Sequence, residues 1–164
     1  MTHPCFITPE ELLKHCTRKN YKDSGPGGQH RNKVETGVQL THIPTGTSAR
    51  AGERRQQSDN LRIALKRLRL QLALEHRSEW QAPSELWSQR CQNKKIVCNL
   101  EHNDFAALLT ELLNSLQASE YDVKKCAESL AISPSQIVKF LKKIPPALEG
   151  LNKTRQEYGL GMLR

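Results

Sequence analysis

The residues best suited to chemistry lie in one stretch, Ser24 to Lys33, which reads Ser-Gly-Pro-Gly-Gly-Gln-His-Arg-Asn-Lys. Gly27 and Gly28 can adopt a positive φ without a Cβ clash, and they leave backbone N–H groups bare for a substrate to approach. Gln29 follows directly, with an uncharged side chain that carries two donors and one acceptor. The stretch ends in polar and cationic residues that suit phosphate: His30, Arg31, Asn32 and Lys33. This composition predicts a loop that presents its backbone inside an RNA-lined cavity.

Two phosphate-binding motifs do not fit this stretch. A Walker motif is excluded because no Gly-Lys-Ser or Gly-Lys-Thr follows the glycines. A dinucleotide-binding motif is excluded because no apolar strand precedes them within a βαβ unit. A flexible glycine-rich turn without chemistry is the remaining alternative for a lone Gly-Gly pair. The motifs that follow along the chain therefore decide between a turn and a reactive loop.

The charge of the chain indicates an acidic polymer as partner. The 164 residues carry a net charge of +8, with a pI of about 9.4. Of the 25 Lys and Arg residues, 14 lie in residues 1–77, together with only 7 of the 17 Asp and Glu residues. Such an uneven basic half is typical of nucleic-acid binding. Aromatic residues make up 5% of the chain, too few for the stacking platforms of single-strand binders.

The cysteines predict free thiols and no disulfide framework. Their number is odd, their spacing is irregular and no Cys-x-x-Cys occurs among them: Cys5, Cys16, Cys91, Cys98 and Cys126. A metal site is conceivable at His3, Cys5, His15 and Cys16, but these intervals fit no ligand pattern. We therefore expect no metal and no cofactor.

The same features bear on the compartment. Free thiols indicate a reducing cytosol. No apolar run approaches the ~20 residues that span a bilayer, and no signal peptide is visible at the start. We expect a cytoplasmic protein without membrane contact.

A small sheet is predicted around the glycine stretch. Residues 17–23 read as extended and residues 32–35 as a helical turn. Residues 37–43 alternate apolar and polar side chains with the period of two that marks a half-buried strand. A turn at Pro44-Thr45-Gly46 then leads into a returning strand at residues 47–51.

Two helices are predicted beside this sheet. Residues 8–16 form a short helix, with Thr8 as N-cap and Glu11 completing a capping box. The polar residues 53–59, which include two arginines, lead into a long helix at residues 58–77. Its apolar stripe comprises Leu61, Leu65, Leu68 and Leu72, with Ile63 and Leu70 at the margins. Its other sides carry the cations Arg62, Lys66, Arg67, Arg69 and Arg77.

The second half of the chain reads as a connector followed by helices. Within the connector, residues 78–100, residues 85–90 fit one or two helical turns and residues 94–100 fit a strand or an extended cover. An amphipathic helix at residues 103–117 places its apolar residues on one side: Phe105, Leu108, Leu109, Leu112, Leu113 and Leu116. Further helices are expected at residues 122–131, 133–143 and 148–158.

The helices at residues 122–143 faintly resemble a helix-turn-helix. Ser133 is the expected N-cap of the second helix, and Pro145-Pro146 ends it. Three lysines cluster on this helix: Lys139, Lys142 and Lys143. An ordinary helical hairpin that packs its own leucines is the alternative.

The glycine stretch and the residues after it resemble the peptidyl-hydrolase domain of class I peptide chain release factors. That family carries Ser-Gly-x-Gly-Gly-Gln, then Asn-Lys three residues on, matched by residues 24–33. Its strand ending in His-x-Pro-Thr-Gly is matched by residues 42–46, and its Arg/Gln/Asn-rich link into a basic helix by residues 53–60. The resemblance covers residues 7–73, somewhat under half the chain. Arg31 departs from it, since many members have a small apolar residue there.

The resemblance implies a fold and an activity. The fold is α+β, with a small sheet and packed helix in residues 1–77, a connector at 78–100 and an all-helical C-terminal extension at 101–164. The activity is hydrolysis of the ester between peptide and tRNA in the ribosomal peptidyl-transferase centre. The implied partners are large-subunit RNA and peptidyl-tRNA, and we expect a monomer.

The resemblance also assigns roles to residues. The backbone N–H of Gln29 would stabilise the oxyanion of the tetrahedral intermediate, and the Gln29 side chain would place water. Gly27 and Gly28 would set the backbone for that donor, which makes these three the catalytic residues. Contacts with RNA are expected from Ser24, His30, Arg31, Asn32, Lys33, Arg54, Arg55, Lys66 and Arg67.

Three function classes stay open. Codon-reading members carry further domains, for which this chain has neither the length nor a recognisable codon-reading tripeptide, so we expect codon-independent hydrolysis on stalled ribosomes. Its nearly neutral second half departs from the basic tail that some short members place in the mRNA channel. Hydrolysis on split large subunits is the first alternative, and a non-catalytic RNA- or DNA-binding protein is the second. Whether Gln29 is methylated, as it often is in the family, is a further open point.

Overall fold

The computed structural model describes residues 2–22 and 34–164. The chain divides into two compact units, Met1–Glu75 and His76–Arg164, and each is described by itself. Strands and helices both occur among the described residues, which confirms the predicted α+β class. None of the helices in these ranges is long and apolar enough to cross a bilayer.

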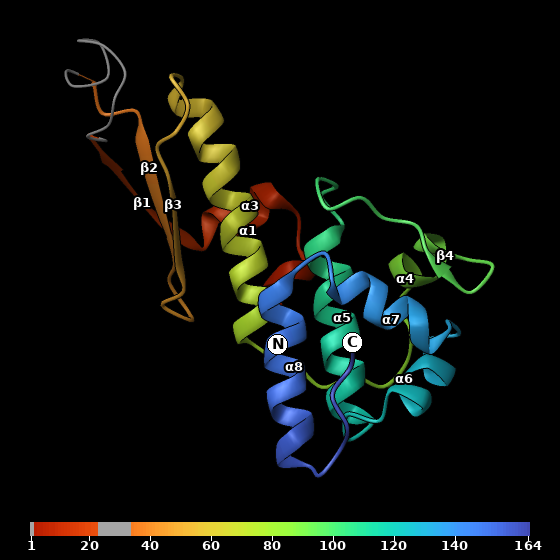
Figure 1. The fold of residues 1–164 in the computed structure, drawn as a ribbon. Coiled ribbons are helices and arrows are strands. Elements are labelled where there is room, and N and C mark those ends of the chain that lie inside the picture. Colours follow the sequence, from red (N-terminus) through yellow and green to blue (C-terminus); the bar gives the residue numbers. More distant parts are fainter. Residues whose placement is uncertain (1, 23–33) are drawn as a thin grey trace. The chain divides into compact units, whose positions relative to one another are not determined.

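The first unit is built on an antiparallel sheet of three strands in the order β1-β2-β3 (Figure 1). The strands are β1 (Cys16–Tyr21), β2 (Gly37–His42) and β3 (Ser48–Ala51). Helix α3 (Gln57–Glu75) packs against β2 and β3. The predicted hairpin and the extended segment before the glycine stretch are therefore confirmed.

Side chains of β2 alternate between the helix side and the opposite side of the sheet. Val38, Leu40 and His42 are buried, whereas Gln39 between them is only half-buried. This confirms the period of two read from the sequence. Ile43, predicted as the last residue of the strand, instead lies in the turn and is 62% exposed.

Helix α1 (Pro9–Lys14) precedes the sheet. The Thr8 hydroxyl accepts a hydrogen bond from the Glu11 N–H at 3.2 Å, which confirms the predicted N-cap. The helix ends at Lys14 and not at Cys16 as predicted, because Cys16 already belongs to β1.

The buried side of α3 differs from the predicted stripe. Leu61 and Leu65 were expected there but are only half-buried. Leu68 and Leu72 are buried as predicted, and the small side chains Ala64 and Ala73 are buried beside them. Small residues let a helix approach a sheet closely, and a stripe read from large apolar residues misses them. The helix also ends at Glu75, so Arg77, predicted as its last residue, lies beyond it.

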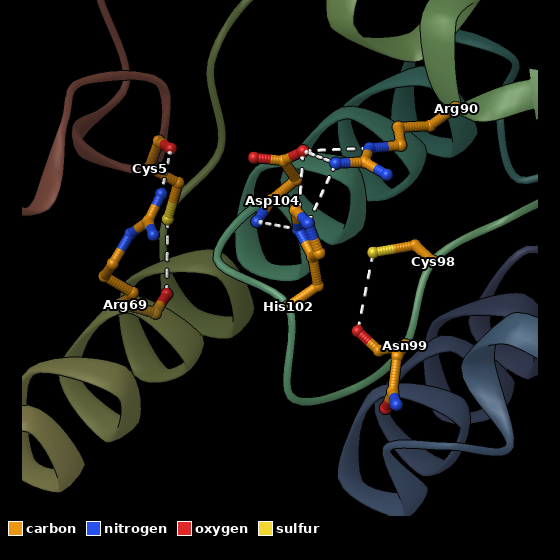
Figure 2. A network of polar contacts seen from close by, with 7 residues as sticks. All are labelled: Cys5, Arg69, Arg90, Cys98, Asn99, His102 and Asp104. Atoms are coloured by element: carbon orange, nitrogen blue, oxygen red, sulfur yellow. Dashed lines mark hydrogen bonds and ion pairs between the residues drawn. The ribbon is translucent and has the colours of Figure 1, made fainter.

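Arg69 was expected on an outer side of α3 but is only 7% exposed. Its guanidinium donates to the backbone oxygen of Cys5 at 2.9 Å, and the Cys5 thiol donates to the backbone oxygen of Arg69 at 3.2 Å (Figure 2). Cys5 lies in the 3-10 helix η1 (Pro4–Phe6), which contacts α3. A buried cation needs polar partners, and here the pairing fixes the N-terminal segment on α3.

The second unit opens with short elements. Helix α4 (Glu85–Arg90) confirms the helical turns predicted there. A two-stranded hairpin of β4 (Cys91–Gln92) and β5 (Lys95–Ile96) follows. The two residues between these strands, Asn93 and Lys94, have φ angles of 50° and 60°. Two consecutive positive φ values are typical of a type I′ hairpin turn.

Helix α5 (Phe105–Ala118) is the centre of the second unit. Every residue from Phe105 to Leu116 is buried, so the predicted amphipathic character is wrong: the helix is covered on all sides. Its polar residues find partners inside the unit. Thr110 donates to a backbone carbonyl one turn earlier at 2.8 Å, and the Asn114 side chain exchanges two hydrogen bonds with Ser78.

A buried carboxylate of α5 also holds the start of α4. The two Glu111 oxygens accept from the backbone N–H and from the hydroxyl of Ser84, both at 2.6 Å. The Ser84 hydroxyl in turn accepts from the Trp87 N–H at 3.0 Å as the N-cap of α4. The Trp87 ring is 1% exposed, and its Nε1 donates to the backbone oxygen of Leu130 at 3.0 Å.

The Asp104 carboxylate, just before α5, fixes the segment that leads into this helix. Nε and one terminal nitrogen of Arg90 donate to a single Asp104 carboxylate oxygen at 2.9 and 2.7 Å (Figure 2). The same terminal nitrogen lies 2.9 Å from Nε2 of His102. The Asp104 N–H donates to Nδ1 of that imidazole at 3.1 Å. These contacts tie α4 to the start of α5.

Three helices complete the second unit: α6 (Val123–Ser129), α7 (Pro134–Leu141) and α8 (Pro145–Glu157). With α5 they account for all helices and strands after residue 100, which confirms the all-helical extension. The predicted N-cap of α7 needs a correction. Ser133 precedes α7 as expected, but its hydroxyl is hydrogen-bonded to the Ser135 hydroxyl at 2.9 Å and makes no bond to the helix backbone.

The end of α7 also differs from the prediction. The helix stops at Leu141, and Pro145 occupies the first position of α8, which therefore starts three residues earlier than expected. Lys143 was predicted on this helix but lies two residues past its end, where it is exposed. Its ammonium donates to the backbone oxygen of Cys98 at 2.8 Å and lies 5.4 Å from the centre of the Phe140 ring.

Candidate functional site

The predicted reactive stretch lies outside the residues that the structure describes. This holds for Ser24, Gly27, Gly28, Gln29, His30, Arg31, Asn32 and Lys33. The helical turn predicted at residues 32–35 falls partly there, and its described residues Val34 and Glu35 are not helical. What the structure gives is the frame at both ends of the stretch.

The frame is the pairing of β1 with β2, which runs from Cys16 opposite His42 to Tyr21 opposite Gly37. Residues 22–36 therefore leave and re-enter the sheet at directly neighbouring positions. Antiparallel neighbours can be joined by as few as two residues, so this segment is a long insertion at one end of the sheet. Long insertions between paired strands commonly carry function.

Tyr21 and Gly37 close the insertion through a contact that only glycine permits. A Cβ built on Gly37 would lie 2.6 Å from two carbons of the Tyr21 ring. The ring therefore lies directly on the glycine, and the two strands are held together by this contact as well as by their backbone pairing.

Alanine at position 37 is expected to destabilise the protein by about 1–3 kcal/mol, because the ring has to move off its strand neighbour. Urea unfolding followed by circular dichroism measures this. Gly150→Ala is the matched control, since a Cβ there meets nothing within 4 Å. Equal unfolding midpoints for the two variants would show that the Tyr21 contact is unimportant.

Asn60, at the start of α3, holds the segment that leads from the glycine stretch into β2. Its side chain is fully buried. The amide nitrogen donates to the backbone oxygens of Thr36 at 2.8 Å and Arg54 at 2.9 Å, and the amide oxygen accepts from the Arg54 N–H at 2.9 Å. One side chain thus joins α3, the link before it and the residue that precedes β2.

Gln57 makes a parallel connection one turn earlier. Its amide nitrogen donates to the backbone oxygen of Glu35 at 2.8 Å, and its amide oxygen accepts from the Arg18 guanidinium at 2.6 Å. Arg18 lies in β1, so Gln57 bridges the strand before the insertion and the segment after it. The carbonyls of residues 35 and 36 are both bound by the start of α3.

The His-x-Pro-Thr-Gly motif lies at the opposite end of β2 and builds the turn into β3. The His42 ring nitrogen Nδ1 lies 2.8 Å from the Thr45 hydroxyl, which also accepts from the Thr47 N–H at 3.3 Å. Gly46 donates to the His42 backbone oxygen at 2.8 Å and has a φ of +71°, which favours glycine. Within the described residues this motif is structural, and β2 separates it from the insertion by about 17 Å of strand.

Four of the predicted RNA-binding cations lie among the residues that the structure describes. Arg54 and Arg55 are exposed in the link before α3, and Lys66 is half-buried on the helix. Arg67 is not simply solvated: its guanidinium forms an ion pair with Glu53 at 2.6 Å and donates to the backbone oxygen of Arg50 at 2.9 Å.

The Glu53 carboxylate is held ionised by its surroundings. Burial raises the pKa of Glu53, but hydrogen bonds from the backbone N–H groups of Glu53 and Gly52 and the nearby Arg67 guanidinium outweigh it. The pKa therefore lies below its ordinary value. The Glu53 carboxylate is accordingly ionised at neutral pH beside the Arg67 guanidinium.

A cleft of about 480 Å³ lies at the end of the sheet where β1 ends. Its walls include Tyr21 and Lys22 from β1 and its exit, Arg50 from β3, and the Glu53 and Arg67 pair. Three cations against one carboxylate make its lining positive.

The residues imagined as a metal site serve other purposes. The His3 ring nitrogen Nδ1 accepts from the Cys5 N–H at 3.2 Å, and the Cys16 thiol donates to the backbone oxygen of Leu12 at 3.2 Å. Across residues 2–22 and 34–164, no group of three or more His, Cys, Asp or Glu residues is placed to hold a metal ion.

The residues that hold the two ends of the predicted reactive stretch were not predicted from the sequence. The residues 53–60, rich in arginine, glutamine and asparagine, were read as a source of cations, whereas Gln57 and Asn60 at the start of α3 bind backbone carbonyls. Their polarity at the buried start of an amphipathic helix was the signal that could have indicated this. The Tyr21 and Gly37 contact had no such signal, because the strand register was unknown.

Comparison with known proteins identifies the region that contains this frame. A family model described as RF-1 domain matches residues 9–104. Peptide chain release factor 1 of Xylella fastidiosa is 40% identical over 72 residues, which are 44% of this chain and 20% of that protein. Peptide chain release factor 1 of Ureaplasma parvum serovar 3 is 43% identical over 79 residues, 48% of this chain and 19% of that protein. Peptide chain release factor 2 of an Acidovorax species is 48% identical over 52 residues, 32% of this chain and 14% of that protein.

The chain spans about a fifth or less of the length of these relatives. The family match begins at α1, includes the three strands and α3, and ends just before α5. It thus extends past the region on which the resemblance of motifs rested. Because residues 9–104 are more than half of the sequence, the chain belongs to the RF-1 domain family, within the class I release factors that its motifs indicated.

Proposed function

We propose that this protein hydrolyses the ester between a nascent peptide and tRNA on the ribosome, without reading a stop codon. One observation carries the proposal. In a chain of the RF-1 domain family, Gly27, Gly28 and Gln29 lie in the one insertion whose ends Tyr21 and Gly37 pair in the sheet. A paired sheet whose entry into β2 is held by Gln57 and Asn60 is a suitable base from which to present a reactive segment.

The proposed chemistry rests on a backbone donor. Attack of water on the ester gives a tetrahedral intermediate with negative charge on oxygen, and an N–H directed at that oxygen lowers the barrier. We assign this donor to the Gln29 backbone, and the placing of water to the Gln29 side chain. Gly27 and Gly28 give the backbone the freedom to aim it. His30 is assigned a positioning role, because no carboxylate partner lies nearby in the sequence.

The cations supply the attraction to RNA. Arg54, Arg55 and Lys66 are proposed to contact phosphates of large-subunit RNA or peptidyl-tRNA, as are the polar residues of the stretch itself. Arg67 is proposed to act together with Glu53 at the cleft. We propose a monomer that works in the cytoplasm.

The second unit is proposed to select the ribosomal state. Residues 105–164 lie outside the family match and fold as helices of their own. This leaves two substrates for the hydrolysis, the whole stalled ribosome and the split large subunit. We favour the whole ribosome.

A non-catalytic nucleic-acid binder is the second candidate, and the arrangement of α6 and α7 favours it. These two helices contact each other through a tight turn in which Ala131 has a φ of +54°. Lys124, Lys125 and Lys139 are exposed on them, and Lys142 is exposed directly after α7. A helix-turn-helix contact with nucleic acid would use such lysines.

A release assay on two substrates separates these candidates. Labelled peptidyl-tRNA is presented on whole ribosomes stalled without a codon in the A site and on isolated large subunits. We expect release from whole ribosomes. Release from isolated subunits alone would move the substrate to the split particle, and no release from either would favour the binder.

A further inference from the structure

The sheet of the first unit has one covered and one open side. Residues directly opposite each other on paired strands point to the same side. Val38 and Leu40 are buried in the strand that α3 covers, so the residues that alternate with them point away from the helix. We call these residues the open face: Thr17, Lys19, Gln39, Thr41, Ser48 and Arg50.

The open face consists of two rows that cross all three strands. Thr17, Thr41 and Ser48 are paired in one row, which carries three hydroxyl groups. Lys19, Gln39 and Arg50 are paired in the other, which carries two cations with an amide between them.

This face is polar, positive and accessible. Thr17, Lys19, Ser48 and Arg50 are exposed. Its two cations lie on the outer strands β1 and β3. The spacing of neighbouring strands puts them about 10 Å apart. None of the six residues is acidic. The cleft beside β1 shares Arg50 with it and adds Lys22, while its Arg67 is paired with Glu53, so the positive surface continues toward the insertion.

We infer that the open face binds the backbone of a double-stranded RNA segment, an inference that rests on the proposed function for the presence of RNA. An A-form duplex presents a wide and shallow minor groove with 2′-hydroxyls, flanked by phosphates. Hydroxyl and amide side chains exchange hydrogen bonds with 2′-hydroxyls, and Lys19 and Arg50 bind the phosphates on either side. The open side of the three-stranded sheet presents these side chains on one surface, and a shallow groove leaves its 2′-hydroxyls within their reach.

Single-stranded RNA fits the same face poorly. Binding of unpaired bases relies on aromatic rings on which they stack. The six residues of the open face include no aromatic residue. Tyr21 at its edge lies on Gly37, where its ring closes the insertion. The open face therefore recognises the RNA backbone and the shape of the duplex, without specificity for the bases.

The test compares two double variants that each remove two positive charges. Lys19→Gln with Arg50→Gln changes the open face, and Lys14→Gln with Arg62→Gln changes α1 and the exposed side of α3. The probe is a fluorescent RNA hairpin of about 16 base pairs, the span that double-strand readers cover. Binding is measured by anisotropy across a salt series, and thermal unfolding checks that both variants fold.

The open-face variant is expected to bind the hairpin at least tenfold more weakly than wild type. The slope of log affinity against log salt should fall by roughly 1.8, because each lost phosphate contact removes about 0.9. In the control variant, the slope should fall by less than half as much. Equal losses in the two variants would overturn the inference, as would tighter binding of wild type to a single-stranded RNA of the same length.

The outcome is separable from that of the proposed function, since hairpin binding involves no ester. Peptide release by wild type together with unchanged hairpin binding by the open-face variant would end this inference and leave the proposed function standing. Hairpin binding as expected, without any release, would do the reverse.

Discussion

Replacing Gly28 by alanine is expected to slow peptide release by about 100-fold or more, which is the typical effect of losing one oxyanion donor. The proposed mechanism places this donor on the backbone of Gln29. A Cβ at position 28 restricts the backbone angles that direct the N–H and crowds the approach of the ester. Single-turnover release from stalled ribosomes at saturating protein measures the chemical step.

The comparison with neighbouring variants tests the backbone assignment. Gly27→Ala is expected to resemble Gly28→Ala, and Gln29→Ala should be no more severe, because it keeps the N–H and loses only the side chain. Gly150→Ala in α8 is the control, with a wild-type rate expected. A severe Gln29→Ala with harmless changes at both glycines would transfer the catalytic role to the glutamine side chain.

Replacing Asn60 by alanine is expected to lower the free energy of unfolding by about 2–4 kcal/mol. Three hydrogen bonds are lost at a fully buried position, and the Thr36 and Arg54 backbone groups are left without these partners. Asn60→Asp should be similarly harmful, because its carboxylate keeps the acceptor for the Arg54 N–H but cannot donate to the two carbonyls. Urea unfolding monitored by circular dichroism gives the values.

An exposed asparagine provides the control for this experiment. The Asn20 side chain accepts one hydrogen bond from Arg18 at 3.0 Å on the surface of β1, so Asn20→Ala should change the stability by less than about 0.5 kcal/mol. Since Asn60 also holds the segment that leads into β2, its variants should reduce peptide release even at temperatures where they are folded. Asn60→Ala as stable as Asn20→Ala would show that the link is held by other contacts.

Local patterns predicted the parts of this fold that depend on neighbours in sequence. The Thr8 cap, the alternation in β2 and the turn after it all follow from spacings of a few residues. What failed depends on tertiary contacts. The burial of α5 on all sides could not be predicted, because an apolar stripe does not show whether the polar residues of the same helix are also covered. The burial of Arg69 required its pairing with a cysteine 64 positions earlier.

For the candidate site the division is similar. The motif around Gly27, Gly28 and Gln29 is contiguous and could be recognised directly, and membership in the RF-1 domain family agrees with it. The border residues Gln57 and Asn60 bind carbonyls more than twenty positions away, and no local pattern encodes that. The contact of Lys143 with the Cys98 carbonyl could not be predicted either, because the two residues lie 45 positions apart.

The complete burial of α5 has a consequence for how the second unit forms. Its covering comes from both directions in the sequence, from Ser78 and the α4 region before it and from α6 and Phe140 after it. A nascent chain that has only reached α5 already has the cover from Ser78 and the α4 region but lacks the cover from α6 and Phe140, so part of a leucine-rich helix is exposed. We expect this unit to complete its fold only after synthesis has passed α7, and the exposed leucines favour aggregation until then.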